Sequence, residues 1–274
     1  MTELVVRRLL VDLDTPIEAR WNGGDAFRSA WFNALSMSFP IGEQYFIDSL
    51  RCGLQHVPEP QRAALAGEVQ GFIGQEATHR RVHALFNGHL ERLGFDNEIE
   101  RRARRRLQAN AFRHASVHVA ATAATEHFTS IFANWMLRHP HALEGTEARI
   151  KTMWYWHCAE ESEHRSTAFT IYQAMGGNHE MRIKVFHYIS FVFLTDVLRQ
   201  TVRNLWHDGS LFSWRTWRSA LPFLLGRDGM LRGNLQAWRD YHGPAFHPGL
   251  HDASLAHRWL AENGSQFTPV GQAS

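Results

Sequence analysis

The chain of 274 residues has only two cysteines, Cys52 and Cys158. Two thiols are too few for a disulfide scaffold, so the fold has to depend on a buried core. The sequence also lacks any run of about 18 consecutive apolar residues that would indicate a transmembrane helix. Its first residues do not have the basic and then apolar pattern of a secretion signal. We therefore expect a cytoplasmic protein with no transmembrane segment.

A large excess of charge of one sign is also missing. The 29 basic and 27 acidic residues leave a net charge of +2 when histidine is neutral. This excess is too small to indicate nucleic acid as a partner. The most basic stretch, residues 101–106, is predicted to be a solvated helix face, partly balanced by Glu98 and Glu100. The alternative is a docking surface for an acidic redox partner, which would be sensitive to salt.

What the sequence does contain is a duplicated pattern of glutamate and histidine. Two E-x-x-H units stand 85 positions apart, and a lone glutamate precedes each unit by 33 or 35 positions. The units are Glu76 with His79 and Glu161 with His164, and the lone glutamates are Glu43 and Glu126. Each half is thus predicted to contain a helix with one glutamate, a turn, and a helix with a glutamate and a histidine.

This pattern is typical of a buried metal centre. Residues three apart lie on one face of a helix, so the carboxylate and imidazole of one unit can reach a common ion. A single E-x-x-H is expected about once by chance, and only the matched pair with its upstream glutamates makes the signal specific. Oxygen and nitrogen donors favour Fe or Mn over thiolate-binding metals. We predict six metal ligands: Glu43, Glu76, His79, Glu126, Glu161 and His164.

The fold predicted from this ligand inventory is all-α: a ferritin-like four-helix bundle with additional helices and a tryptophan-rich C-terminal extension. We expect a single domain over residues 1–274, with a metal-binding core at about 24–207, an extension at about 210–263 and a disordered tail at 264–274. A short extended segment is expected within residues 4–13. The predicted helices cover about 25–52 with an interruption at Pro40, 58–93, 96–139 with a break near 112–116, 143–175, and a buried apolar helix at 180–207.

Other polar side chains are expected around the ligands. His83 and His157 lie one helical turn from ligand positions, and each is predicted to pack nearby more often than to bind metal. Glu160 is the fallback ligand, because the register of its helix is ambiguous. Arg80 and Arg165 follow the two ligand histidines, and they either pair with carboxylates or face solvent.

Two further residues near the ligands are expected to have no direct role. Cys158 stands three before Glu161 and is predicted to be a small buried hydrophobe, with a supporting role behind the ligands as the alternative. Tyr45 stands two after Glu43, so it should point away from the ligand face, and we do not expect it to be a radical site.

Four stretches of the chain resemble a bacterial family catalogued as predicted metal-dependent hydrolases, with a ferritin-like di-iron carboxylate site. They are residues 42–46, 75–79, 160–164 and 241–248. The resemblance extends over most of the chain, and none of the six ligand positions departs from it. By likeness to ferritin-like di-iron oxidases and oxygenases, it implies O2 activation by two metal ions, whereas the ligand set argues against a literal reading of the hydrolase label.

The favoured function is therefore a dinuclear oxidoreductase that uses O2 to oxidise a small aromatic or apolar substrate. It would need two Fe ions, with Mn or Fe/Mn as alternatives, and an external electron donor. The first alternative is a metal-dependent hydrolase, with Zn as its ion, and the second is an iron-oxidising or metal-storing bundle. A homodimer is one expectation for the assembly. The aromatic segment 180–207 and the tryptophans beyond residue 209 either wall a substrate pocket or pack as ordinary core.

Overall fold

The computed structural model describes residues 4–271, and it confirms the all-α class. Helices account for nearly all of its regular structure, and the strands β1 (Arg7–Leu9) and β2 (Phe267–Pro269) form one small sheet. The helices are α1 (Ala26–Gln55), α2 (Gln61–Arg92), α3 (Glu98–Asn110), α4 (Ala115–Arg138), α5 (Ala148–His164), α6 (Thr167–Ala174), α7 (His179–His207), α8 (Trp214–Leu225), α9 (Met230–Gly233), α10 (Leu235–Asp240) and α11 (Ser254–Glu262).

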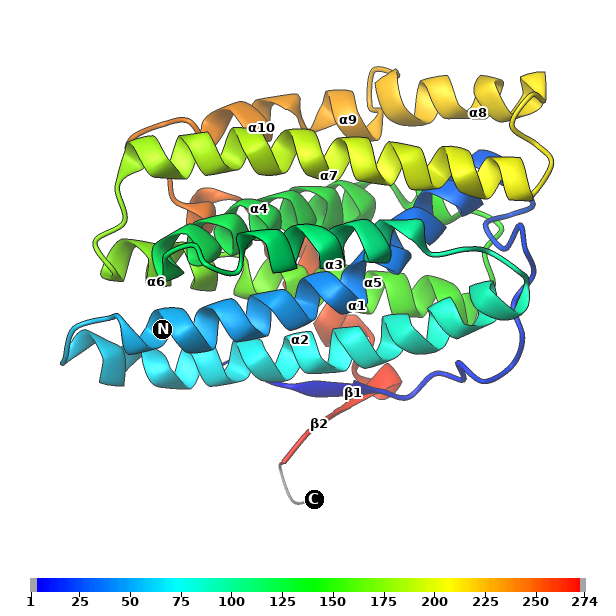
Figure 1. Cartoon of the computed structure of the whole chain (residues 1–274). Helices are drawn as coiled ribbons and strands as arrows, with labels where there is room; N and C mark the ends of the chain where they lie inside the picture. Colours follow the sequence, from blue (N-terminus) through cyan, green and yellow to red (C-terminus); the bar gives the residue numbers. More distant parts are fainter. Residues whose placement is uncertain (1–3, 272–274) are drawn as a thin grey trace.

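Four of these helices surround the centre of the molecule. α1 packs along α2, α4 packs along α5, and the two pairs meet through contacts of α1 with α4 and of α2 with α5. Figure 1 shows the two pairs running along one another, with α7 across one side and α8 to α10 beyond α7. The C-terminal helix α11 packs on α5 and α4. The four helices that carry the predicted ligands are therefore neighbours.

The expected interruption at Pro40 is wrong, because α1 continues through this residue. A proline inside a helix has no N–H for the carbonyl four residues earlier, which here belongs to Ser36. Asn87 of α2 supplies the missing donor, since its Nδ2 donates to the Ser36 carbonyl at 2.9 Å. Asn97 in turn donates to the next carbonyl, that of Met37, at 3.2 Å. Side chains from other elements thus allow α1 to remain continuous beside Glu43.

The single helix expected over residues 143–175 is also wrong. The structure has a 3-10 turn at Pro140–Leu143, then α5, and α5 ends at His164 before α6 begins. In an uninterrupted helix the Ser162 carbonyl would accept the N–H of residue 166, but the Arg165 side chain donates to it instead. The expected break near 112–116 is confirmed, since α3 ends at Asn110 and α4 starts at Ala115.

The prediction that residues 180–207 form a buried helix is wrong for one face of α7. Phe186 and Val197 are fully buried, but Phe191 is 69% exposed and Trp206 is 66% exposed. An apolar composition does not by itself dictate burial, because much of any protein surface is apolar. Within residues 4–271, α7 and the other helices all lack the combination of length and hydrophobicity that a bilayer span requires.

Both ends of the described chain meet in the small sheet. The expected extended N-terminal segment is confirmed as β1 (Arg7–Leu9), which pairs antiparallel with β2 (Phe267–Pro269). The disordered tail expected from residue 264 is therefore wrong for these residues, while 272–274 lie outside the described part. The segment before β1 lies tightly on α2, because a Cβ added at Gly74 would come within 2.3 Å of the Val6 side chain. This close approach fixes Arg7 beside the bundle.

Candidate metal centre

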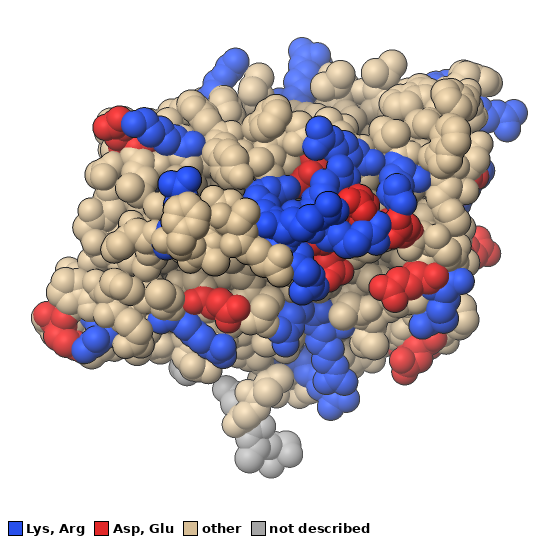
Figure 2. Space-filling model, viewed as in Figure 1, with Lys and Arg blue, Asp and Glu red and all other residues tan. Residues whose placement is uncertain are grey.

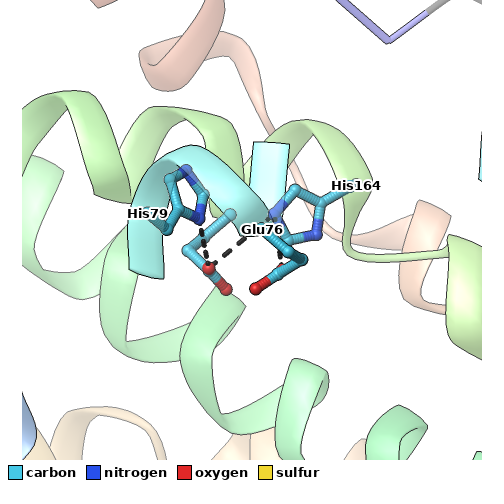
Figure 3. A group of neighbouring side chains, drawn as sticks. Glu76, His79 and His164 are labelled. Atoms are coloured by element: carbon cyan, nitrogen blue, oxygen red, sulfur yellow. Dashed lines mark ion pairs between the residues drawn. The ribbon is translucent and has the colours of Figure 1, made fainter. Parts of the chain in front are cut away.

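Four of the predicted ligands form one compact group between α2 and α5. Glu76, His79, Glu161 and His164 each offer an atom, and these atoms all lie within 4.8 Å of one another. The contacts cross between the two E-x-x-H units: His164 Nε2 is 3.3 Å from Glu76 Oε1, and His79 Nδ1 is 3.4 Å from Glu161 Oε1. Figure 3 shows the labelled side chains converging from the two helices. Each carboxylate thus faces the histidine of the other unit.

The two lone glutamates reach the same region from α1 and α4. His164 Nδ1 is 2.9 Å from Glu126 Oε2. Glu43 belongs to a second compact group, in which it joins His83 and His157 with ligand atoms within 4.8 Å of one another. The two groups are adjacent, because His157 Nε2 is 3.4 Å from Glu161 Oε1. All six predicted ligands therefore lie around one place, each on the helix that the sequence indicated.

The six side chains have the burial and the unmet bonding capacity of a cation site. None is more than 2% exposed. Each has at least one buried oxygen or nitrogen without a hydrogen-bond partner, and for Glu43 and Glu76 both carboxylate oxygens lack one. Buried carboxylates without partners are costly, and a bound cation would remove that cost. Four carboxylates and two imidazoles fit divalent metals that prefer oxygen and nitrogen donors.

The pKa values in the cluster reflect this crowding of acids. Burial, followed by the charges of the neighbouring glutamates, raises the pKa of Glu76 well above its usual range. Burial likewise raises the pKa of Glu43, against the charge of His79, and raises that of Glu126 to about 7. Burial also opposes the charged form of Glu161, but the charge of His164 and the hydrogen bond from His79 outweigh it and lower the pKa of Glu161.

An ion-pair chain outside the cluster holds His79. Its Nε2 lies 3.0 Å from Glu160 Oε2, so Nδ1 is the nitrogen left facing the cluster. Arg7 from β1 contacts the other oxygen of Glu160 at 3.0 Å and also pairs with Glu163. Burial alone would lower the pKa of His79, but its bonds to Glu160 and Glu161 raise it to about 10. Glu160 thus lies behind His79 and does not face the cluster as a fallback ligand would.

Sequence reasoning missed Arg7 entirely. It stands 153 positions before Glu160 and belongs to a strand that carries no functional motif. Gln75, which precedes Glu76 on α2, was also missed, because it donates at 2.9 Å to Glu163, a residue 88 positions later in the chain. The signal in the sequence was Glu160 itself, an additional acid directly before Glu161 on α5, which would need a cation if it were buried.

His83 and His157 form a second chain of hydrogen bonds, and both are fully or nearly fully buried. His83 Nε2 is 3.1 Å from His157 Nδ1, and the other ring nitrogen of His83 is 2.8 Å from the Ser36 hydroxyl. Burial and the charge of His79 lower the pKa of His157 to about 3, so its imidazole is neutral. A neutral imidazole whose Nε2 faces Glu161 is able to bind a cation.

The remaining side chains singled out in the sequence lie outside the cluster. Arg165 does not pair with a carboxylate, since its guanidinium donates to backbone carbonyls of Ser162, Pro248 and His251. Arg80 is partly buried, and its charge acts against the rise in the pKa of Glu43. Burial raises the pKa of the Cys158 thiol, whose Sγ lies 3.6 Å from Met136 Sδ, as expected of a small buried hydrophobe.

A cavity of about 560 Å³ adjoins the cluster between α1, α3, α4 and α7. Its lining is mostly apolar, and Phe39 separates it from the histidines: the Phe39 ring stacks on His157 with ring centroids 4.8 Å apart. Tyr45 lines this cavity and bonds to His118, pointing off the ligand face as expected. α7 contributes to the wall, whereas no residue beyond 209 is among the lining residues in the described part of the chain, so the tryptophan-rich extension does not form this pocket.

The basic stretch 101–106 lies on the outside of α3. Figure 2 shows basic side chains gathered over this helix with acidic ones among them. Arg101 pairs with Asp96 and Glu98, Arg104 with Glu100, and Arg105 with Glu98. Arg102 and Arg106 both pair with Asp196 of α7. This extensive pairing agrees with the prediction of a solvated helix face.

Comparison with known proteins adds one finding. Neither the curated proteins nor the solved structures gave a match to the chain. One family model, described as "Predicted metal-dependent hydrolase", matches residues 5–252 and therefore covers the β1 strand, the whole cluster and the cavity. With the matched region including every residue of the cluster described above, the chain belongs to the family of predicted metal-dependent hydrolases.

Proposed function

We propose that the cluster would hold two metal ions, with Glu76 and Glu161 among the residues that hold them. The crossed contacts support this assignment, because Glu161 Oε1 lies 3.4 Å from His79 Nδ1 and 3.7 Å from His164 Nε2. A carboxylate placed between two histidines on different helices can help to hold a cation near either of them. Glu76 has the matching place, since it extends from the His79 helix toward His164.

The other residues then divide between the two ions. Glu126 and His164 would hold one ion, since their side chains are already in contact. Glu43 and His79 would hold the other, and His157 is an additional ligand for this ion, because it shares a compact group with Glu43 and faces Glu161. In this assignment His83 positions His157, and Glu160 positions His79, as outer partners of metal-binding histidines commonly do.

We propose further that the protein is an oxidase or oxygenase that acts on a small apolar molecule, with two Fe ions as its metal. Bound iron would supply the reduction of O2, which a set of oxygen and nitrogen donors suits. The chain itself supplies an enclosed site and an apolar cavity beside it, and both keep water away from the reacting groups. For a hydroxylation, O2 would give one oxygen to the substrate and one to water, and an external donor would supply two electrons.

A metal-dependent hydrolase is the second candidate, and the family description favours it. In that case the two ions would lower the pKa of bound water and polarise the scissile group. The apolar lining of the cavity is the observation against it, because a hydrolase must admit water together with a polar ester, amide or phosphate. The observation that carries the oxidative proposal is thus the pairing of a buried carboxylate cluster with an apolar cavity.

Metal loading separates the two candidates. Protein reconstituted with Fe(II) without air is mixed with O2, and O2 consumption is followed with an electrode. We expect about one O2 per pair of ions in a fast phase. Protein loaded with Zn(II) is tested in parallel against a panel of ester, amide and phosphate substrates. Hydrolysis by the Zn form, together with slow O2 consumption by the Fe form, would overturn the oxidative proposal and support the hydrolase.

Matched variants establish that the cluster is responsible. Glu76→Ala should abolish the fast O2 consumption, whereas Glu91→Ala, an exposed glutamate on the same helix, should leave it unchanged. For the histidines, His164→Ala should act like Glu76→Ala, and the exposed His257 provides the control as His257→Ala.

A further inference from the structure

The shape of the cavity beside the metal cluster is elongated. Its lining positions run from Val117 to Thr129 on α4 and from Lys184 to Asp196 on α7. At 1.5 Å per helical residue, each of these spans corresponds to about 18 Å. A volume of about 560 Å³ spread over that length leaves a narrow channel and not a round chamber.

One end of the channel lies against the cluster. Phe39, Thr129 and Phe193 line this end, and Thr125 and Thr129 flank the predicted ligand Glu126 along α4. The Phe39 ring stacks on His157 and meets the His83 ring edge-on, with centroids 4.6 Å apart. A molecule that fills the channel therefore has its inner end within one side-chain layer of the cluster.

The other end is the mouth, and it is cationic. Arg113, Lys184 and Tyr188 are the lining residues that are exposed to solvent. Arg113 lies just before α4 and Lys184 in the second turn of α7, so both mark the end farthest from Phe39. The acidic lining residue is Asp196, which lies toward the inner half of the channel on α7 and is already paired with Arg106 and Arg102. No other acid of the described residues lines the cavity, but Lys184 pairs at 2.6 Å with Glu180, an exposed residue of α7 outside the lining, so an anionic group at the mouth would have to compete with this solvent-exposed pair.

From this arrangement we propose that the channel binds an elongated apolar molecule with a single anionic group, of which a medium-chain fatty acid is the simplest example. The apolar body lies along α4 and α7, and the anionic group sits at the mouth between Arg113 and Lys184. The inference deepens the proposed function and rests on it for the reaction, which takes place near the end of the chain remote from the anion. The binding itself does not depend on that reaction.

Binding of matched ten-carbon compounds to the metal-loaded protein, measured by calorimetry, tests this proposal. Decanoate and decyl phosphate carry the anion, decanol is neutral, and decyltrimethylammonium reverses the charge. We expect the anions to bind about tenfold more tightly than decanol, and the cation to bind more weakly still. The ratio of decanoate to decyl phosphate distinguishes a fatty acid from a phosphorylated lipid. Equal affinity for all four compounds, or no binding of decanoate, would overturn the proposal.

Variants locate the ligand. The double variant Arg113→Ala/Lys184→Ala should weaken decanoate about tenfold and leave decanol unchanged. Arg104→Ala is the control, because Arg104 is exposed on α3 and does not line the channel. Val192→Trp, which fills the inner part of the channel beside Phe193, should abolish binding of every compound, whereas Leu198→Trp on the same helix should not. Unchanged binding by the Val192 variant would place the ligand elsewhere and contradict the inference.

The two proposals can fail separately. Calorimetry on the Zn-loaded protein reports chain binding without any redox chemistry. Binding of decanoate by a protein that consumes no O2 as the Fe form would leave the channel assignment intact and refute the oxidative function. Fast O2 consumption by a protein that binds no decanoate would support the oxidative function and refute the channel assignment.

Discussion

The two E-x-x-H units look alike in sequence but differ in the residues that hold their histidines in place. In the α2 unit, His79 is held from outside the cluster by Glu160, and Glu160 is held by Arg7 of β1. In the α5 unit, His164 contacts Glu126, which is itself a predicted ligand. α2 also continues for three turns beyond its histidine, whereas α5 ends at His164.

This difference teaches that a duplicated ligand pattern need not form two equivalent metal positions. The ion beside His79 would have supports outside the cluster in Arg7, Glu160 and His157, and the ion beside His164 would depend on the cluster itself. We therefore expect the two positions to differ in affinity and in their response to mutation.

The largest effect is expected when a ligand is removed. His164→Ala and Glu76→Ala should each reduce the bound metal from about two ions per chain to less than one, since both residues contact the shared carboxylate cluster. We also expect melting temperatures about 5–10 °C below the metal-loaded parent, because buried carboxylates lose their cation. Metal analysis and calorimetry provide the measurements, with Glu91→Ala as control. Full metal content in both variants would contradict the assignment.

Chelation should produce a comparable loss in the parent protein. Stripping the metal should lower its stability by about 3–4 kcal/mol, as for a ligand present at 100–1,000 times its Kd. The same treatment should barely alter the His164→Ala variant, which has little metal left to lose. A parent protein whose unfolding is indifferent to chelator would show that the cluster folds without a cation.

The next largest effect tests the asymmetry directly. Arg7→Ala leaves Glu160 buried without its cation, so the metal position beside His79 should weaken about 10–100-fold while the other remains filled. Titration should then show one tight ion per chain in place of two. Arg8→Ala, one residue along the same strand and exposed, is the control. Equal weakening of both positions would mean that the two halves share one support.

These outcomes also bear on what the sequence could predict. The grouping of the six predicted ligands could be predicted from spacing, because side chains three apart on a helix share a face, and the six side chains do lie together. Arg7 could not be predicted, since its role depends on a strand that packs on α2 through the glycines 71 and 74. The break after His164 could not be predicted either, because the Arg165 side chain, and not a proline or glycine, ends α5.

The helical prediction for α1 failed for a related reason. A proline normally signals a boundary, but Asn87 on another helix satisfies the carbonyl that Pro40 leaves free. Likewise, the apolar run of α7 indicated burial, yet sequence alone could not reveal that Phe191 and Trp206 face outward. In each case the deciding partner comes from a distant part of the chain.

A smaller effect is expected from the contact between Asn87 of α2 and the Ser36 carbonyl of α1, which belongs to the α1/α2 half alone. Asn87→Ala should destabilise the protein by about 1–3 kcal/mol, because the Ser36 carbonyl would lose its donor. In a Pro40→Ala background the same substitution should cost less, since residue 40 would regain an N–H for that carbonyl. A double-mutant cycle by denaturant unfolding measures the coupling. Identical costs in the two backgrounds would show that Asn87 does not compensate for the proline.

The smallest effect is expected on the surface of α3. Arg104→Ala removes an exposed pair with Glu100, and such pairs contribute at most about 1 kcal/mol. Its unfolding midpoint should match the parent at high salt. A loss of stability larger than this would mean that the basic stretch contributes more to the fold than its exposed ion pairs suggest.

The two-stranded sheet has a consequence for the order in which the protein matures. Arg7 leaves the ribosome early, but its strand gains its partner only after residues 267–269 have been synthesised. The nascent protein thus has both E-x-x-H helices long before the guanidinium behind His79 is locked in place. Contacts between such distant segments form slowly because a long loop must close first. A metal ion captured during translation would therefore enter a loosely supported pocket, and firm retention would await the pairing of β1 with β2.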